Sequence, residues 1–363
     1  MRCVTGRLRH AQAVRLVLML VGLGGTAHSP ITAQSIPAET GHAFGLELQA
    51  TIGRGRNLGV LIDGTVRPDG SVCAIDYSAG EVNCFAADGT FLWKAGRKGR
   101  GPGEFELPYR IAADANGRLL VYDLSDRSIT WLSPNGQFEI RRPLPLGLAQ
   151  VNSLRVLPSG EIALAGYAPR GGRSAGAGVH VFDDTLAYLR SFGALPAAKD
   201  RLVLEHWGSG VVSVLPDSQL AYAKVAPGEI FVLDDRGRQH GRIRAGHLKE
   251  TTLDAAFSVE RGATGVRIGS SGTPFPRLGL VLSIGGGRLA VNRWQGGQDD
   301  RQFWDVYSPM GKLIQIVPTA RSWGFPIGSA DHGHVLWAIG SEHDEPVLVK
   351  LRVVSGSQHS KAN

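Results

Sequence analysis

The chain is poor in cysteine and, after its first 34 positions, in long apolar runs. Three cysteines in 363 residues are too few for a disulfide-framework domain. No segment after residue 34 is long and apolar enough to span a membrane as a helix. The sequence also lacks a His-Glu-x-x-His zinc motif, a serine nucleophile elbow and a phosphate-binding glycine loop. What it has in abundance is glycine, with 49 residues, which suits a turn-rich all-β protein.

Positive charge is weak once the N-terminal segment is set aside. The formal net charge is +7, and four of these charges come from Arg2, Arg7, Arg9 and Arg15. Residues 1–34 contain no Asp or Glu, so the remainder of the chain carries only +3. No dense Lys/Arg run occurs in that remainder. This excludes the phosphate-binding stripe expected of a nucleic-acid-binding protein.

Residues 1–34 have the composition of a signal peptide. A basic start reaches Arg15, an apolar stretch covers residues 16–23, and small residues follow. Cleavage after Ala27 and cleavage after Ala33 both fit this pattern. The alternative is a buried N-terminal helix. The signal peptide predicts an exported protein, either periplasmic or secreted, with no membrane span in the mature chain.

Export leaves Cys73 and Cys84 as the only cysteines of the mature chain. They lie on two predicted neighbouring strands joined by a turn at residues 77–80, where a two-residue loop would place them opposite each other. An oxidising compartment permits a cross-strand disulfide between them. Two buried free thiols are the alternative. A zinc site would need further Cys or His ligands nearby, so the sequence predicts no metal and no cofactor.

An internal repeat is the most informative feature of the chain. Six segments place a glycine or polar turn before an apolar run of strand length: residues 67–77, 114–124, 157–167, 215–225, 284–294 and 330–340. Five segments carry a second hairpin turn after that run: residues 84–96, 131–143, 181–193, 232–244 and 306–318. Asp-Gly, Asn-Gly or Met-Gly at several of these turns supplies the positive φ that a tight hairpin needs. Each unit therefore predicts four strands.

Repeated four-stranded antiparallel units are the blades of a propeller. The sequence predicts an all-β, six-bladed β-propeller over residues 35–355, followed by a disordered tail over residues 356–363. The last unit supplies only three strands, whereas residues 45–53 form an orphan strand pattern just after the signal peptide. We expect this N-terminal strand to complete the last blade as its outer strand. Such closure removes the exposed edge of an open ring.

Residues 94–136 resemble the NHL-type repeat. They contain Gly-Pro-Gly-Glu-Phe, a following Pro, an Asp-x-Asn-Gly turn, a Tyr-Asp pair and an Arg before an aromatic-capped strand. The match is close over this segment and fades in the other units. The resemblance implies an exported bacterial six-bladed propeller related to NHL-repeat proteins. That group includes binding modules, lyases and lactonases, so the resemblance supports the fold and leaves the activity open.

Ligands of propellers gather on the face that carries the blade-to-blade links and the loops between second and third strands. Candidate ligand-binding residues on that face are Arg97, Arg100, Arg110, His206, Trp207, Lys224, Arg293 and Trp294. A basic channel mouth flanked by aromatic residues suits an anionic or sugar-like ligand. The alternatives are solvated surface charges and, for Arg110, an ion pair with the loop of Asp63.

The longest insertion covers residues 245–279. Within it, residues 247–262 predict a short helix, with Thr251 or Thr252 as its N-cap. A helix in a blade-to-blade link lies over the channel face. It would act either as a lid or as a decoration of the blade rim.

These patterns favour a non-enzymatic, monomeric binding or scaffold propeller, whose partner is a protein, a peptide or a saccharide. The alternative is a metal-dependent lactone hydrolase or lyase with calcium or zinc in the central channel. Asp63, Asn152 and Asn292 are the side chains that could approach such an ion from different blades. No catalytic residue is predicted.

Overall fold

The structure is a computed structural model. It describes residues 44–145, 148, 150–168, 176–224, 228–245, 252–262, 265–270, 276–295 and 301–355. The chain divides into two units, Met1–Ser35 and Ile36–Asn363, and all described residues belong to the second. The predicted signal peptide, both of its cleavage sites and the tail 356–363 lie outside the described residues.

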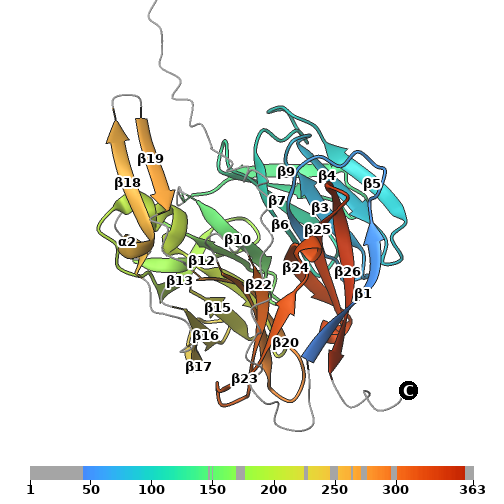
Figure 1. Cartoon of the computed structure of the whole chain (residues 1–363). Coiled ribbons are helices and arrows are strands. Elements are labelled where there is room, and N and C mark those ends of the chain that lie inside the picture. The colour runs from blue at the N-terminus through green and yellow to red at the C-terminus, as the bar shows by residue number, and fades with distance from the viewer. Residues whose placement is uncertain are drawn as a thin grey trace, which may run out of the picture. The chain divides into compact units, whose positions relative to one another are not determined.

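Six four-stranded antiparallel sheets form a ring of blades, which confirms the predicted six-bladed propeller (Figure 1). Blades 1 to 3 consist of β2 (Leu61–Val66), β3 (Val72–Asp76), β4 (Glu81–Phe85) and β5 (Phe91–Gly96); β6 (Pro108–Ala113), β7 (Leu119–Asp123), β8 (Ser128–Leu132) and β9 (Phe138–Pro143); and β10 (Val151–Val156), β11 (Ile162–Gly166), β12 (Ala177–Phe182) and β13 (Tyr188–Ala194). Blades 4 to 6 consist of β14 (Val211–Val214), β15 (Leu220–Ala223), β16 (Glu229–Leu233) and β17 (Gln239–Arg244); β20 (Pro276–Ser283), β21 (Leu289–Gln295), β22 (Gln302–Tyr307) and β23 (Leu313–Thr319); and β24 (Phe325–Ala330), β25 (Val335–Glu342), β26 (Glu345–Ser355) and β1 (Phe44–Ile52).

The hydrophobic core is divided among the interfaces between blades. Each of six clusters of buried residues combines side chains from two adjacent blades. Strands in the middle of a blade are therefore buried on both faces, as β3, β7 and β11 show along their whole length. This accounts for their continuous apolar runs, where a sheet with one solvated face would alternate. No blade is stable alone, because its apolar faces need both neighbours.

The N-terminal strand closes the ring, as the sequence predicted. β1 pairs with β26 in antiparallel register, from Phe44 opposite Ser355 to Ile52 opposite Leu348. The backbone of Phe44 also exchanges two hydrogen bonds with the Gln315 side chain of blade 5, at 2.7 and 2.9 Å. β1 thus supplies the outer edge of blade 6 and ties that blade to its predecessor.

Turn glycines in blades 1, 2, 4 and 5 allow each of these blades to approach the outer strand of the preceding blade. Gly136 adopts φ +84°, and a Cβ at this position would lie 2.6 Å from the ring of Trp93 on blade 1. Gly89 adopts φ +93°, and a Cβ there would lie 2.8 Å from the Ile52 side chain of β1. The glycine is required twice, for its backbone angle and for the space. Its recurrence in the repeats follows from how blades stack.

The predicted helix over residues 247–262 is wrong for residues 257–262, which form a strand, whereas residues 247–251, including the candidate N-cap Thr251, lie outside the described residues. The structure has one helical turn, α2 (Leu253–Ala256), which the Thr252 hydroxyl caps by accepting a hydrogen bond from an amide at 3.2 Å. A hairpin follows, formed by β18 (Phe257–Gly262) and β19 (Gly265–Ser270). Apolar and polar residues alternate from position 257 to 260, which is the period of a strand. The pairing partner, 265–270, is what decides between the two structures.

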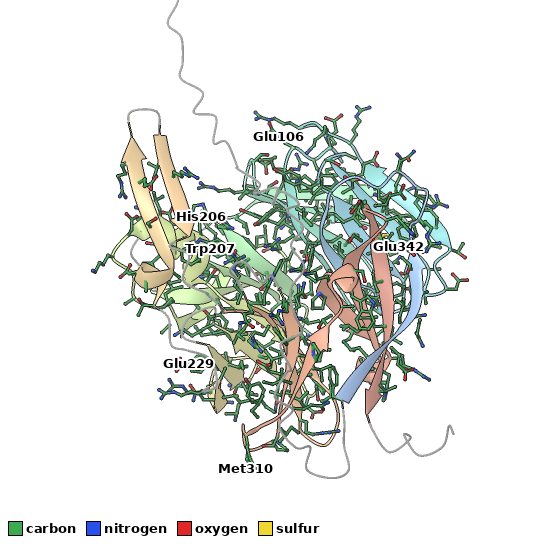
Figure 2. The ribbon with its side chains drawn as sticks, viewed as in Figure 1. Glu106, His206, Trp207, Glu229, Met310 and Glu342 are labelled. Atoms are coloured by element: carbon green, nitrogen blue, oxygen red, sulfur yellow. A yellow bond between two sulfur atoms is a disulfide. The ribbon has the colours of Figure 1, made fainter. Side chains whose placement is uncertain are left out.

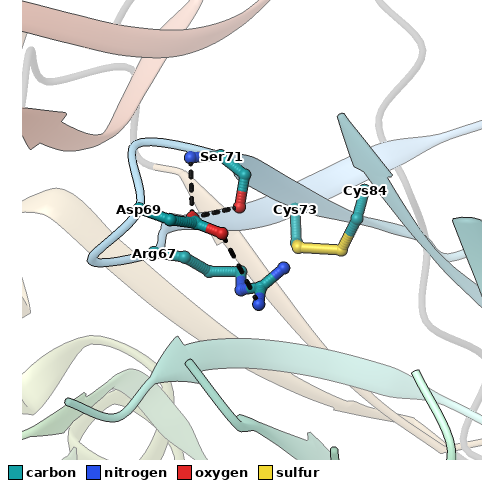
Figure 3. The surroundings of a disulfide bond; sticks show 5 residues. All are labelled: Arg67, Asp69, Ser71, Cys73 and Cys84. Carbon is teal, nitrogen blue, oxygen red and sulfur yellow. Dashed lines mark hydrogen bonds and ion pairs between the residues drawn. A yellow bond between two sulfur atoms is a disulfide. The ribbon is translucent and has the colours of Figure 1, made fainter. Parts of the chain in front are cut away.

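The predicted disulfide between Cys73 and Cys84 is present (Figure 3). The two residues lie directly opposite each other on β3 and β4, and both are fully buried between blades 1 and 2. The turn that precedes β3 is also fixed, because the Asp69 carboxylate accepts hydrogen bonds from the amide and hydroxyl of Ser71. The bond therefore joins two central strands inside a packed interface.

Replacing Cys73 and Cys84 together by alanine should lower the free energy of unfolding by about 3 kcal/mol, because the unfolded chain loses a cross-link. Guanidinium chloride unfolding of the chain 35–363 measures this change. A thiol titration of the unreduced, denatured protein provides the control. Two titrating thiols in that control would contradict the disulfide.

Deleting residues 35–53 should abolish cooperative folding, because blade 6 loses β1 and the ring stays open. Calorimetry of the shortened chain, beside a control that lacks only residues 356–363, measures the effect. We expect the control to melt like the chain 35–363. An unchanged cooperative transition after removal of residues 35–53 would show that β1 is dispensable.

Candidate functional site

The eight candidate residues lie in three separate places. Arg97 and Arg100 belong to the link between blades 1 and 2, whereas Arg110 lies on the innermost strand of blade 2. The other five belong to blades 4 and 5 or to the links beside them. Figure 2 shows His206 and Trp207 near the base of the β18–β19 hairpin, well separated from Glu106.

Arg97 and Arg100 brace the loop that carries them. The Nε of Arg97 donates to Glu104 at 2.7 Å, and Nη2 of Arg100 donates to Glu106 at 2.9 Å. The second carboxylate oxygen of Glu104 accepts the Gly101 amide at 2.8 Å. That amide, with Arg97, holds the pKa of Glu104 below its usual value. The same loop inserts Phe105, fully buried, between blades 1 and 2.

Lys224 and Arg293 are buried cations with carboxylate partners. The Nζ of Lys224 lies 3.9 Å from Glu229, and Arg293 makes a bidentate contact with Asp305 at 2.6 and 3.1 Å. Burial lowers the pKa of Lys224, an effect that Glu229 opposes. Both cations are committed to contacts within their own blades, which stabilises those blades.

Blades 1 and 2 carry an aspartate at the position that is occupied by Lys224 in blade 4 and by Arg293 in blade 5. Four residues after the start of the second strand, blades 1 and 2 carry Asp76 and Asp123, and blades 4 and 5 carry Lys224 and Arg293. Asp123 accepts the amides of residues 106 and 107 and so fixes a short blade link. Blades 4 and 5 lack this carboxylate, and they are the blades beside the long insertions of the chain.

Trp207 and Trp294 are brought together by Arg277. The Trp207 ring stacks on Phe257 of β18, with centroids 4.8 Å apart and planes 6° apart. The guanidinium carbon of Arg277 lies 4.0 Å from the Trp207 ring and 5.9 Å from the Trp294 ring. Arg277 is the residue that sequence reasoning missed, because it stands in an irregular loop pattern with no motif around it.

These contacts anchor a small substructure outside the blades. It consists of α1 (Arg201–Val203), a π-helical turn η1 (Leu204–Gly208), α2, β18 and β19, and we call it the hairpin platform. The Asp200 side chain caps α1 through the Leu202 amide at 2.9 Å. His206 is used within the same turn, since its Nδ1 lies 2.8 Å from the Leu202 carbonyl. A separate apolar cluster, which includes Trp207 and the two strands, packs the platform together.

A pocket opens beside the platform. Its volume is about 460 Å³, within the usual range for ligand sites. Its lining residues are Lys199, Asp200, Arg201, Leu202, Glu205 and Arg261. Ion pairs at 2.7 Å join Arg201 to Glu205 and Arg261 to Asp200. Three cations and two carboxylates thus share one open pocket, with one positive charge in excess.

The Arg110 side chain extends from β6 to the neighbouring inner strand, β10. Its Nε donates to the Asn152 carbonyl of blade 3 at 2.7 Å, and its Nη1 donates to the Tyr109 carbonyl at 2.8 Å. Asp63 instead accepts the Ile111 amide at 3.0 Å. Within the described residues no ion pair closer than 4 Å joins Arg110 to Asp63. The two side chains instead form separate hydrogen bonds with the backbone of neighbouring strands.

Two of the three side chains considered for a channel cation donate hydrogen bonds within the protein. The Asn152 amide donates to the Ser209 hydroxyl at 2.7 Å, and the Asn292 amide faces the Phe303 carbonyl. Asp63 has Arg110 as a charged neighbour, which opposes binding of a dication. Among the residues that the structure describes, no three His, Cys, Asp or Glu side chains are grouped to hold a metal ion. The described helices also include none that is long and apolar enough to cross a membrane.

Comparison with known proteins supports the fold. No protein-family model matches the chain, and no curated protein matches its sequence. Virginiamycin B lyase from Staphylococcus aureus is similar in structure, with a TM-score of 0.51 and 12% identity over 86% of this chain and 100% of that one. A DUF4221 member from Bacteroides vulgatus has a TM-score of 0.56 and 9% identity, covering 86% of this chain and 98% of its own.

A third similar structure is the PQQ-bound aldose sugar dehydrogenase from Streptomyces coelicolor, with a TM-score of 0.51 and 12% identity over 86% of this chain and 99% of that one. The chain shares the propeller fold with all three. At such low identity the similarity carries no activity across, because this fold hosts many unrelated functions. The relation to NHL-repeat proteins stays a prediction.

Replacing Trp207 by alanine should loosen the hairpin while leaving the ring folded. The aromatic stack and the cation–π contact are each worth about 1 kcal/mol, so amide exchange in β18 and β19 should accelerate roughly tenfold or more. Hydrogen exchange followed by mass spectrometry measures this. Trp93→Ala, on the rim of blade 1, is the matched control and should leave exchange in β18 and β19 unchanged. Equal exchange in the two variants would show that Trp207 does not anchor the hairpin.

Proposed function

We propose that the protein is an exported, monomeric binding propeller whose recognition element is the hairpin platform. The observation that carries the proposal is the pocket between residues 199–205 and β18, which combines cations and carboxylates in one open site. The platform lies outside the six blades and adds no strand to any of them. Its presence is therefore not required for ring closure, and a role in recognition accounts for it.

Aromatic and cation–π contacts anchor the platform to blade 5. The stack of Phe257, Trp207 and Arg277 ties its first strand to the π-helical turn and to blade 5. A side chain held in place before binding loses little conformational entropy when the ligand arrives. At the same time the strands present polar and charged residues outward, among them Arg261 and Arg267. Rigid anchoring and a polar outer surface suit reversible binding of a polar ligand.

The pocket's residues favour an acidic saccharide as the ligand. Lys199, Arg201 and Arg261 supply donors for a carboxylate or sulfate group, while Asp200 and Glu205 supply acceptors for sugar hydroxyls. The excess of one positive charge complements an anionic ligand. A short acidic peptide is the second ligand class that the same donors would accept. No observation on the described residues favours a metal-dependent hydrolase or lyase over this binding function.

Replacing Arg261 by glutamine should weaken binding of uronic acid oligosaccharides to the chain 35–363 by about tenfold or more, since a charged hydrogen-bond partner is lost and Asp200 becomes an uncompensated negative charge. Isothermal titration calorimetry measures the affinity. Arg267→Gln is the matched control, because Arg267 lies on the paired strand outside the pocket lining and carries the same charge. Equal affinities of the two variants would contradict the proposed pocket. Absence of binding to the unmutated chain would exclude this ligand class.

A further inference from the structure

The innermost strands of the ring are joined by side chains that bond to the backbone of the next strand. Asp63 accepts the Ile111 amide, and Ser153 accepts the Val212 amide, both at 3.0 Å. Ser213 accepts the amide of residue 281, also at 3.0 Å. Between β6 and β10 the polarity is reversed, since Arg110 donates to the Asn152 carbonyl at 2.7 Å. These bonds give Asp63 and Arg110 a structural role, and they leave one charged inner residue unexplained.

That residue is Arg155, the second-last residue of β10. The same position on other inner strands holds Thr65, Ala112, Ser213 and Leu282, so a long cation is unusual there. The only hydrogen bond of its guanidinium within the described residues runs from Nη1 to the Leu154 carbonyl at 2.7 Å. The remaining donors of the guanidinium have no protein acceptor in the described part of the chain.

The guanidinium groups of Arg155 and Arg110 contact the same inner strand, because they donate to the carbonyls of Leu154 and Asn152, two residues apart on β10. Burial lowers the pKa of Arg155, Asp63 opposes that shift, and the positive charge of Arg110 adds to it. In turn burial raises the pKa of Asp63, while Arg110 and Arg155 both lower it. β2 and β10 are not neighbours, because β6 packs between them. Asp63 on β2 and Arg155 on β10 therefore lie on either side of β6.

The interior thus contains two guanidinium groups and one carboxylate. Within the described residues no ion pair closer than 4 Å joins Asp63 to either arginine, and one oxygen of Asp63 is already bonded to backbone. A partly buried cation without a close anionic partner is costly, and an anion that contacts it offsets the cost. Asp63 and Arg155 keep part of their surface exposed, so a small solute can reach them.

We propose that the ring interior between β2, β6 and β10 is a binding site for one carboxylate-sized oxyanion, held by Arg155 and Arg110. The guanidinium of Arg155 offers two parallel N–H donors, the geometry that matches the two oxygens of a carboxylate. Arg110 is held in place by two carbonyl oxygens and by the Tyr109 ring, 4.0 Å from its guanidinium carbon. It adds a second positive charge from a fixed position. Asp63 limits the affinity by repelling the anion.

The site is independent of the hairpin platform, and its test separates the two. Acetate serves as the probe, titrated by calorimetry into the chain 35–363 at constant ionic strength. We expect saturable binding of one acetate per chain. Arg155→Gln should weaken that binding at least tenfold, because it removes a positive charge that attracts acetate. Asp63→Asn should strengthen it several-fold, because it removes a negative charge that repels acetate. Arg236→Gln, which removes an exposed arginine from the β16–β17 turn, is the matched control and should behave like the unmutated chain.

Three results would overturn the proposal. They are equal acetate affinity in Arg155→Gln and Arg236→Gln, absence of saturable binding to the unmutated chain, and a weakened affinity in Asp63→Asn. Loss of acetate binding in Arg261→Gln together with its retention in Arg155→Gln would assign the anion to the platform pocket and also contradict the interior site. If Arg155→Gln fails to fold, Arg155→Lys replaces it. Lysine keeps the charge without the paired donors, so we expect a smaller but measurable loss of affinity.

Discussion

Burial of each blade against its two neighbours is the interaction on which the whole molecule depends. All six ring clusters of buried residues lie between blades. The last of them forms only when the ring closes, because it combines Ile52 of β1 and Phe85 of blade 1 with Trp337 of blade 6. The closing strand, the turn glycines and the buried loop around Phe105 all serve this arrangement. Stability is therefore a property of the complete ring.

A closed ring restricts where function can lie. Both faces of each blade are used in packing, so binding sites are confined to the links, the turns and the interior. The chain differs from blade to blade in these places. Blades 1 and 2 cap their links with Asp76 and Asp123, whereas blades 4 and 5 have buried cations there and long insertions beside them. The hairpin platform is formed by the links before and after blade 4. The proposed recognition site therefore lies beside blades 4 and 5.

The interior and the platform are joined by a short piece of chain. Trp207 holds the hairpin, and two residues later the hydroxyl and carbonyl of Ser209 accept the Asn152 amide inside the ring. Asn152 in turn provides the carbonyl that orients Arg110. The two proposed sites are separate in their chemistry but share this structural connection.

Local sequence alone predicted the number of blades, the role of the N-terminal strand and the pairing of Cys73 with Cys84. Turns and apolar runs of strand length are patterns of consecutive residues, so they can be recognised without knowing the tertiary structure. Only the tertiary structure decided that residues 257–262 form a strand, since the Trp207 ring that stacks on Phe257 comes from the link that precedes blade 4. It likewise joined Arg277 to both tryptophans and brought Arg110 of β6 onto a carbonyl of β10 near Arg155. Such contacts depend on the curvature of the ring, which brings together side chains that no local pattern relates.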